Sequence, residues 1–295
     1  MKLAAGWEDY KIIATSGGMK LENWKGIILL RPDPQVIWTG RDLYKYPGID
    51  AVYHRSESGG GRWEIKKSFP QEWQVSYRDM GFLVKPMGFK HTGLFPEQAV
   101  NWDAMRAVIA AAKVKDPDRK IKVLNLFAYT GGASVACAKE GAFVTHVDAA
   151  KGMVDRASQN ARLSGIKEGI RYIVDDCSKF VAREIRRGNR YDAVIMDPPS
   201  YGRGPGGEMW KIEQDLFPFV QECAKLLSDD PLFVLINSYT TGLQPGVLDN
   251  LLKLTLTMQG VEGSIEAYEV GLPTEEGICL PCGASGLFVG ENYGG

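Results

Sequence analysis

Three segments of this sequence end an apolar run with residues that could bind a charged ligand, and they follow one another in a fixed order. The first, residues 122–136, passes through Gly131-Gly132 into a helical pattern. Such a turn lets a ligand approach bare backbone, and the helix N-terminus offers unpaired N–H groups. Asp148 ends the next apolar run, roughly 20 positions further on, where a nucleoside ribose is usually held. A third run ends in the stiff turn Asp197-Pro198-Pro199, and the ordered set predicts a site for a nucleoside-containing ligand.

Strand and helix patterns alternate after about residue 95, and they would bring the three turns to one edge of a sheet. We expect helices at residues 101–114, 132–140, 151–163, 178–187, within 211–227 and at 245–258. We expect strands at 123–127, 143–147, 170–174, 192–196 and 232–236, then a final pair at 264–270 and 279–289. Five strand–helix units imply a parallel sheet covered on both faces, and the final pair indicates an antiparallel strand at one edge. The predicted fold is therefore α/β and Rossmann-like, with a mostly parallel seven-stranded sheet.

The first 95 residues have a different texture, rich in Trp, Tyr, Val and Ile and broken by Gly and Pro. Short strands are expected at residues 25–31, 35–39, 62–67, 73–78 and 81–86. The sequence therefore predicts two domains. Residues 1–95 would form a small β-rich substrate or lid domain, and residues 96–295 the α/β domain.

Composition narrows the class of protein. The 295 residues carry a formal net charge of -1, so overall electrostatics predict neither a nucleic-acid binder nor a membrane-surface protein. Five scattered cysteines favour reduced thiols over a disulfide framework. The first residues contain no apolar core long enough for a signal peptide, and no later apolar run approaches membrane-spanning length, so we expect neither element. We expect a cytoplasmic protein without a membrane partner.

Other nucleotide sites fit the sequence less well. A nicotinamide site prefers Gly-x-Gly-x-x-Gly at the first strand–helix turn, which here holds Gly131-Gly132 alone. That spacing occurs only at residues 202–207, after the fourth strand and with a proline inside it, so this segment is interpreted as a substrate loop or a plain surface loop. No phosphate-binding loop motif follows any strand. Each aspartate taken alone could also be a helix cap.

Three motifs carry a resemblance to a known family. They are Asn125-Leu-Phe-Ala-Tyr-Thr-Gly-Gly132, Asp197-Pro-Pro-Ser-Tyr201 and His91-Thr-Gly-Leu-Phe-Pro-Glu-Gln98. With them the chain resembles the class I S-adenosylmethionine-dependent methyltransferases. It is most similar to the branch of large-subunit ribosomal-RNA methyltransferases that form 5-methylcytosine or 7-methylguanine. The resemblance covers roughly residue 82 to the C-terminus, with a weaker match before it.

The resemblance implies a cofactor site for S-adenosyl-L-methionine, with S-adenosyl-L-homocysteine as product. The methionine part would be lined by Phe127, Ala128, Tyr129 and Gly131, and Gln98 would help to hold its amino-acid end. Asp148 would bind the ribose, and Asp176 with Cys177 the adenine. Phe95 and Ala149 would complete the cofactor site, and Asp197 would sit beside the sulfonium methyl. Since the sulfonium is already activated, positioning and desolvation could carry the catalysis without a metal.

The acceptor side is expected to involve Asp197, Pro198, Pro199 and Tyr201. The two prolines fix the turn and remove two N–H donors, so acceptor groups face the site and could hold an amino group, while Tyr201 could stack on a base. Carbon-5 methylation needs a cysteine, which in this branch follows the fifth strand. Residues 236–242 contain none, so we expect a nitrogen target in RNA. We do not expect the branch's usual N-terminal RNA-binding module, and the N-terminal strands would either replace it or only wall off the site.

Several alternatives stay open at this stage. The methyl acceptor could be a small molecule or a protein side chain, or the chain could be a non-catalytic cofactor-binding module. Cys279 and Cys282 are interpreted as strand residues and not as a zinc or redox pair. Four arginines between residues 183 and 190 form either an RNA-contact edge or a solvated helix face. The sequence does not give the oligomeric state.

Overall fold

The computed structural model describes residues 1–56, 60–88, 90–203, 207 and 209–294. The chain divides into two compact units. The first contains residues 1–100 and 270–282, and the second contains residues 101–269 and 283–295. The first unit therefore includes residues 270–282 from the C-terminal part of the chain. The expected division at residue 95 would place this segment in the α/β domain.

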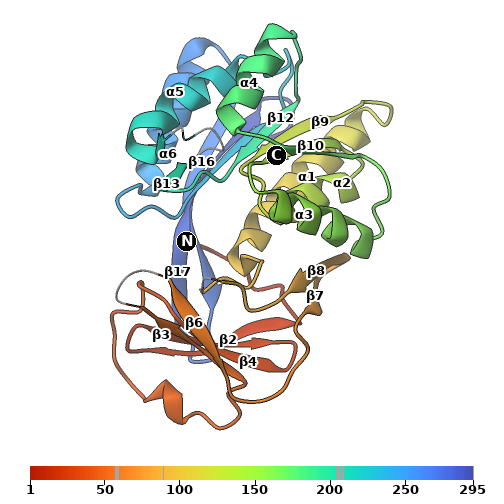
Figure 1. Ribbon diagram of the computed structural model, residues 1–295. Coiled ribbons are helices and arrows are strands. Elements are labelled where there is room, and N and C mark those ends of the chain that lie inside the picture. The colour runs from red at the N-terminus through yellow and green to blue at the C-terminus, as the bar shows by residue number, and fades with distance from the viewer. Residues whose placement is uncertain (57–59, 89, 204–206, 208, 295) are drawn as a thin grey trace. The chain divides into compact units, whose positions relative to one another are not determined.

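One large sheet has the order β1-β16-β17-β15-β12-β9-β10-β11, and most of its strands belong to the second unit (Figure 1). Strand β9 pairs in parallel with β10 on one side and with β12 on the other, β12 pairs in parallel with β15, and β17 is antiparallel to β15. The strand order therefore reverses beside β9, which is where open α/β sheets bind their ligands. The strands are β9 (Lys122–Leu126), β10 (Phe143–Asp148), β11 (Ile170–Val174), β12 (Ala193–Met196), β15 (Phe233–Ser238), β16 (Gly263–Pro273) and β17 (Cys279–Gly290).

This topology confirms the Rossmann-like prediction, with one addition. The two-residue strand β1 (Lys2–Leu3) pairs in parallel with β16 and adds an eighth strand to the seven expected. Such a short strand has no periodicity from which it could have been predicted.

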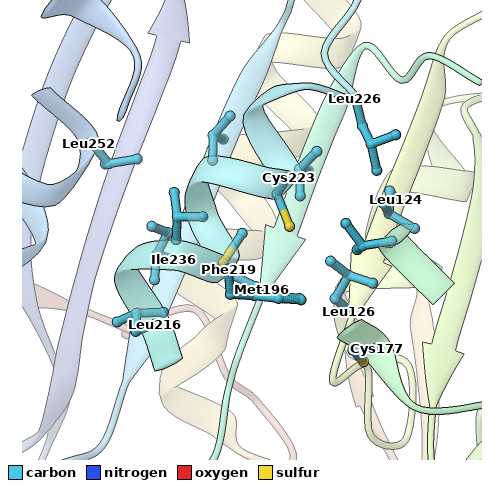
Figure 2. Close-up of a cluster of buried hydrophobic side chains, with 14 of the residues drawn as sticks. Leu124, Leu126, Cys177, Met196, Leu216, Phe219, Cys223, Leu226, Ile236 and Leu252 are labelled. Carbon is cyan, nitrogen blue, oxygen red and sulfur yellow. The ribbon is translucent and has the colours of Figure 1, made fainter. Parts of the chain in front are cut away.

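Six helices cover this sheet among the described residues. They are α1 (Ala99–Lys115), α2 (Gly132–Lys139), α3 (Lys151–Leu163), α4 (Cys177–Arg186), α5 (Ile212–Ala224) and α6 (Pro245–Thr255). In Figure 1, α1, α2 and α3 lie on one face and α4, α5 and α6 on the other. The alternation of side chains along β9 explains both layers. Leu124 and Leu126 enter the apolar cluster beneath α4–α6 (Figure 2), whereas Asn125 contacts α2.

The first unit contains a five-stranded sheet in the order β2-β3-β4-β5-β6 and a separate hairpin of β7 and β8. The strands are β2 (Tyr10–Ser16), β3 (Met19–Trp24), β4 (Ile27–Pro32), β5 (Ala51–Arg55), β6 (Gly61–Ile65), β7 (Trp73–Tyr77) and β8 (Met80–Val84). The strand expected at residues 35–39 is wrong. The backbone carbonyls of Val36 and Trp38 accept hydrogen bonds from the turn glycines Gly18 and Gly17, so this segment meets a turn and not a strand.

A buried ion pair stabilises the first unit. Both oxygens of Glu22 accept hydrogen bonds from Arg31, and Tyr10 donates a third. Burial alone would raise the pKa of Glu22, but Arg31 and Lys20 outweigh it and lower that pKa to about 2. Arg31 also donates to the carbonyl of Lys90, 2.7 Å away, so the pair ties β3 and β4 to the segment before His91.

In the part of the chain that the structure describes, no helix is long and apolar enough to span a membrane. Within the same residues, no group of three or more His, Cys, Asp and Glu side chains could hold a metal ion.

Candidate active site

The turn between β9 and α2 has an unusual backbone. Phe127, Tyr129 and Gly131 have φ angles of 52°, 49° and 84°. Positive φ is uncommon for residues other than glycine and costs of order 1–3 kcal/mol at each position. Two strained residues in one short turn imply that the surrounding structure holds this backbone in place.

Neighbouring elements supply the restraints. The N–H of Tyr129 donates to Oδ2 of Asp148 at 2.8 Å, and the N–H of Phe127 donates to Sγ of Cys177 at 3.3 Å. From α3, Nδ2 of Asn160 donates to the carbonyl of Thr130 at 2.9 Å. The turn is thus tied to β10, α4 and α3.

The two glycines are required by space as well as by conformation. A Cβ on Gly131 would lie 2.8 Å from Cβ of Ala157, and one on Gly132 would lie 2.6 Å from the ring of Trp102. Gly131 is the N-cap of α2 and provides no side-chain hydrogen bond to the helix. The first N–H groups of α2 are therefore uncapped by a side chain, which suits the anionic end of a ligand.

Asp148 lies at the carboxyl end of β10, next to this turn. Its Oδ1 accepts from the N–H of Ala150 at 2.8 Å, so each oxygen holds one backbone donor. A carboxylate has about four acceptor positions, which leaves capacity for the two hydroxyls of a ribose. Burial raises the pKa of Asp148, against the two backbone hydrogen bonds that lower it. Ala149 follows it at an exposed position.

The predicted adenine residues have structural roles of their own. Asp176 is the N-cap of α4, where its Oδ1 accepts from the N–H of Lys179 at 2.9 Å. Cys177 is 3% exposed, and burial raises the pKa of its thiol. Its side chain therefore packs behind the turn between β9 and α2 (residues 127–131), which we call the cofactor turn. Only the amide of Cys177, at the start of α4, fits the predicted contact with adenine. Asp175, one residue earlier, is paired with Arg183.

Asp197 lies beside the cofactor turn. Strand β12 pairs with β9 through Met196 and Leu126, and the N–H of Asp197 approaches the carbonyl of Leu126 at 3.4 Å. The next residue, Pro198, is buried, while Pro199 is exposed. The strand pairing thus brings together the two motifs that the sequence places about 70 residues apart.

An aromatic cluster joins the Asp-Pro-Pro turn to the cofactor turn. Nε1 of Trp210 donates to the carbonyl of Pro199 at 2.7 Å, and the ring of Trp210 lies 5.2 Å from that of Phe127. Phe219 of α5 packs edge-on against both rings, at 5.5 and 5.6 Å. Sequence reasoning missed Trp210 and Phe219, because an aromatic residue on a three-residue strand or on a helix carries no sign of its partner.

Tyr201 belongs to a small hairpin of β13 (Tyr201–Arg203) and β14 (Met209–Lys211). The Tyr201 ring is 54% exposed, and its hydroxyl contacts Sδ of Met209 at 3.2 Å. An exposed ring at this edge of the sheet suits the stacking role that was predicted. Residues 204–206 of the expected substrate loop lie outside the described residues.

The end of β15 contains no thiol but a set of polar side chains. Asn237 and Ser285 accept hydrogen bonds from Nδ2 of Asn101, at 3.0 and 2.9 Å, and Tyr268 donates to Asn101 at 2.7 Å. This network is buried, so Asn101 lies within α1 as a core residue and not as its cap. Further along, Oγ1 of Thr240 lies 2.5 Å from Oγ of Ser200.

A second buried polar chain lies behind the cofactor turn. Nδ2 of Asn125 donates to Oγ of Ser134 at 2.9 Å, and Ser134 is 2.9 Å from Nδ1 of His146. His146 is fully buried, and burial lowers its pKa to about 4. The ring is therefore neutral at pH 7, with Nδ1 accepting if Ser134 donates. Nothing in the sequence pattern identifies Ser134 on α2 and Asn125 on β9 as members of this chain.

Two predicted cofactor residues belong to the first unit. Gln98 ends the short 3-10 helix η2 (Pro96–Gln98), where its N–H donates to the carbonyl of Phe95 at 3.1 Å. The ring of Phe95 lies 5.5 Å from that of His91. Their contacts with the cofactor stay predictions.

The arginines near α4 are engaged locally. Arg183 pairs with Asp175, Arg187 with Glu184, and Arg190 donates to the carbonyl of Lys225. These contacts favour the solvated-face interpretation over an RNA-contact edge.

The strand order and the sites at its reversal define a Rossmann-like protein of the kind that binds a nucleoside-containing cofactor. The family model described as S-adenosylmethionine-dependent methyltransferase matches residues 72–245. The match covers more than half of the chain, and the chain belongs to this family.

Named relatives extend the comparison. The ribosomal RNA large subunit methyltransferase K/L of Pseudoalteromonas atlantica is 33% identical over 173 residues, which are 58% of this chain and 23% of that protein. A putative ribosomal RNA large subunit methyltransferase of Methanocaldococcus jannaschii is 31% identical over 167 residues, or 53% of this chain and 40% of that protein. The chain thus spans less than half the length of these curated relatives.

Two solved structures are similar over nearly the whole chain. The S-adenosylmethionine-dependent methyltransferase from Agrobacterium tumefaciens has a TM-score of 0.88 and 32% identity, covering 96% of this chain and 91% of that one. A putative methyltransferase, SMU.776, solved in complex with S-adenosylhomocysteine, has a TM-score of 0.75 at 16% identity, covering 97% and 76%. The second likeness shows a shared fold.

Proposed function

We propose that this protein transfers the methyl group of S-adenosyl-L-methionine to a nitrogen atom of a base in RNA, with ribosomal RNA as the substrate. The observation that carries the proposal is the pairing of β9 with β12. It sets the Asp197 turn directly beside the strained cofactor turn at Phe127. A cytoplasmic location remains part of the same proposal.

The chain's residues would divide the work as follows. The uncapped start of α2 binds the carboxylate of the methionine part, and Asp148 accepts from the ribose hydroxyls. When bound, S-adenosylmethionine supplies a methyl group on a positively charged sulfur. Asp197 accepts a hydrogen bond from an N–H of the base, so that the lone pair of that nitrogen points at the methyl group. Tyr201 stacks on the plane of the base. The hydrogen bond from Nε1 of Trp210 fixes the carbonyl of Pro199, which completes the Asp-Pro-Pro turn.

A nitrogen target is favoured over carbon 5 of cytosine. Carbon methylation requires a thiolate that adds to the ring. The described thiol nearest in sequence to Asp197 is Cys177, which is buried behind the cofactor turn with its pKa raised. The residues after β15 offer amide and hydroxyl groups instead. The names of the curated relatives support RNA as the acceptor class.

The test is a methyl-transfer assay with labelled S-adenosylmethionine. Undermethylated ribosomal RNA and a metabolite fraction serve as separate acceptors, and digestion of the RNA with mass spectrometry of the nucleosides identifies the methylated atom. Asp197→Ala should abolish transfer while calorimetry still detects cofactor binding. Asp229→Ala is the matched control, since Asp229 is exposed and precedes β15 at the opposite edge of the sheet.

Each outcome bears on a different part of the proposal. A methyl group on carbon 5 would contradict the nitrogen target. Transfer to the metabolite fraction alone would replace RNA by a small-molecule acceptor. Cofactor binding without transfer to either fraction would indicate a non-catalytic module.

A further inference from the structure

The loops that follow β12 and β15 meet through two hydroxyl groups. Oγ of Ser200 and Oγ1 of Thr240 lie 2.5 Å apart, although 40 residues separate them. The parallel pairing of Met196 with Ile236 brings these loops together at the carboxyl edge of the sheet. This edge is also where Asp197 lies, three residues before Ser200.

Backbone hydrogen bonds hold both members in place. The carbonyl of Ser200 accepts from the N–H of Ile212 at 3.1 Å, at the start of α5. The N–H of Thr240 donates to Oγ of Ser238 at 3.2 Å, and its carbonyl accepts from Leu243 at 3.1 Å. The hydroxyl pair is therefore presented by two fixed backbone segments.

The pair is exposed, in contrast to the polar residues at the end of β15 itself. Asn237 and Ser238 are 4% and 2% exposed, and Asn237 is engaged in the buried network with Asn101. Ser200 is exposed and Thr240 is partly exposed. The place where the resembled branch carries its cysteine thus presents hydroxyls to solvent.

Two hydroxyls so close contain two hydrogen atoms, of which one lies between the oxygens. The second is then available for donation to a ligand. An alcohol is a far weaker acid than a thiol, so addition to a base ring does not suit it. The hydroxyl is suited instead to donating a hydrogen bond to an acceptor atom of a ligand. Next to the acceptor Asp197, the pair creates a donor–acceptor edge.

We propose that the Ser200–Thr240 pair binds the methyl acceptor, donating one O–H to a carbonyl oxygen or an unprotonated ring nitrogen adjacent to the nitrogen that is methylated. This inference rests on the proposed RNA methyltransferase function and adds to it the group that selects the edge of the base. The acceptor class is a base in which an N–H or amino group neighbours such an acceptor atom.

The experiment compares Ser200→Ala, Thr240→Val, the double variant and Thr240→Ser. It measures kcat/KM for ribosomal RNA and the calorimetric Kd for S-adenosylmethionine. Each single removal should lower kcat/KM about tenfold, the typical effect of losing one such hydrogen bond to a ligand. The double variant should be little worse, because either change already breaks the pair. Thr240→Ser should keep most of the activity, and the cofactor Kd should stay within about twofold.

The control is Thr257→Val, whose hydroxyl lies after α6 and contacts only the carbonyl of Lys253 at 3.4 Å in the described hydrogen bonds. Single variants with wild-type kcat/KM would overturn the inference while leaving the proposed function intact. The inference would also be overturned if the loss of kcat/KM in the double variant equalled the product of the two single losses. It would be overturned as well if Thr240→Ser were as impaired as Thr240→Val. A wild-type protein that methylates no RNA would overturn the proposed function, and the inference with it.

Discussion

The backbone N–H of Tyr129 donates a hydrogen bond of 2.8 Å to Oδ2 of Asp148. The contact couples a residue held at positive φ to the carboxylate assigned to the ribose. In the proposed site, Asp148 would therefore shape the methionine side through Tyr129 and would also bind the nucleoside side. A change at this carboxylate should affect cofactor affinity through both routes.

Asp148→Asn should weaken binding of S-adenosylmethionine by about 2 kcal/mol, or roughly 30-fold, since hydrogen bonds to a charged group are lost. The amide offers one acceptor oxygen where the carboxylate offers two. Titration calorimetry measures the effect. Asp155→Asn, an exposed change on α3, serves as the control and should bind like wild type. Equal affinities for the two variants would remove Asp148 from the cofactor site.

The same carboxylate gives cofactor binding a pH dependence. Burial raises the pKa of Asp148, so protonation begins at a higher pH than for an ordinary aspartate. Protonation replaces an acceptor by a donor, and wild-type affinity should therefore fall as the pH is lowered towards that pKa. In Asp148→Asn this fall should be absent. Parallel pH profiles of the two proteins would assign the effect to another group.

Gly131→Ala should destabilise the fold and abolish cofactor binding. The alanine would need a φ of 84°, which costs about 1–2 kcal/mol for an L-residue, and its Cβ would lie 2.8 Å from that of Ala157. Gly188→Ala isolates the first effect, since Gly188 has a φ of 68° and nothing within 4 Å of its would-be Cβ. Urea unfolding should show Gly131→Ala to be less stable than Gly188→Ala by about 1 kcal/mol or more. If the two variants lose the same stability, contact with α3 does not restrict the turn.

The α/β part of the fold could be predicted because its signals are local. Each strand–helix unit carries its own apolar run and its own turn, and parallel pairing then follows from the connection rules. The first unit was harder to predict. Strand β2 is buried at six of seven positions and so lacks the alternation that marks a half-exposed strand. Hairpin strands of three residues, as in β13 and β14, are too short to show any period.

Candidate site residues could be proposed from the sequence where one motif contains its own chemistry, and not where two distant residues share it. The Gly131 turn and Asp197 fall in the first group. The contacts of Ser200 with Thr240, of His146 with Ser134 and of Trp210 with Pro199 fall in the second. They form between separate elements, and nothing in either segment alone names the partner.

Trp210→Phe should lower kcat for methyl transfer about fivefold, because the Pro199 carbonyl loses a hydrogen bond of about 1 kcal/mol while the ring contact with Phe127 persists. Binding of S-adenosylmethionine should be unchanged. The matched control is Trp73→Phe in the first unit, where Nε1 donates to the carbonyl of Trp24 at 3.1 Å. Steady-state kinetics separate kcat from KM. An unaltered kcat in Trp210→Phe would show that the turn keeps its geometry without this bond.

His146 should make the fold sensitive to acid. It is fully buried, and burial lowers its pKa from about 6.5 to about 4. Below the ordinary pKa the unfolded chain binds a proton that the folded protein refuses, so the free energy of unfolding should decrease as the pH falls. The decrease should begin near pH 6.5, end near pH 4, and reach about 3 kcal/mol.

His146→Gln removes this titration but keeps an amide that can contact Ser134. At pH 8 the variant should be less stable than wild type, since the buried chain from Asn125 is disturbed. As the pH is lowered to 4.5 the difference should shrink, because only wild type loses stability through this residue. Urea unfolding between pH 8 and pH 4.5 measures the free energy of unfolding of both proteins. His91→Gln provides a second comparison, since burial also lowers the pKa of His91 to about 4. A constant difference between wild type and His146→Gln would mean that the folded protein protonates His146 as readily as the unfolded chain does.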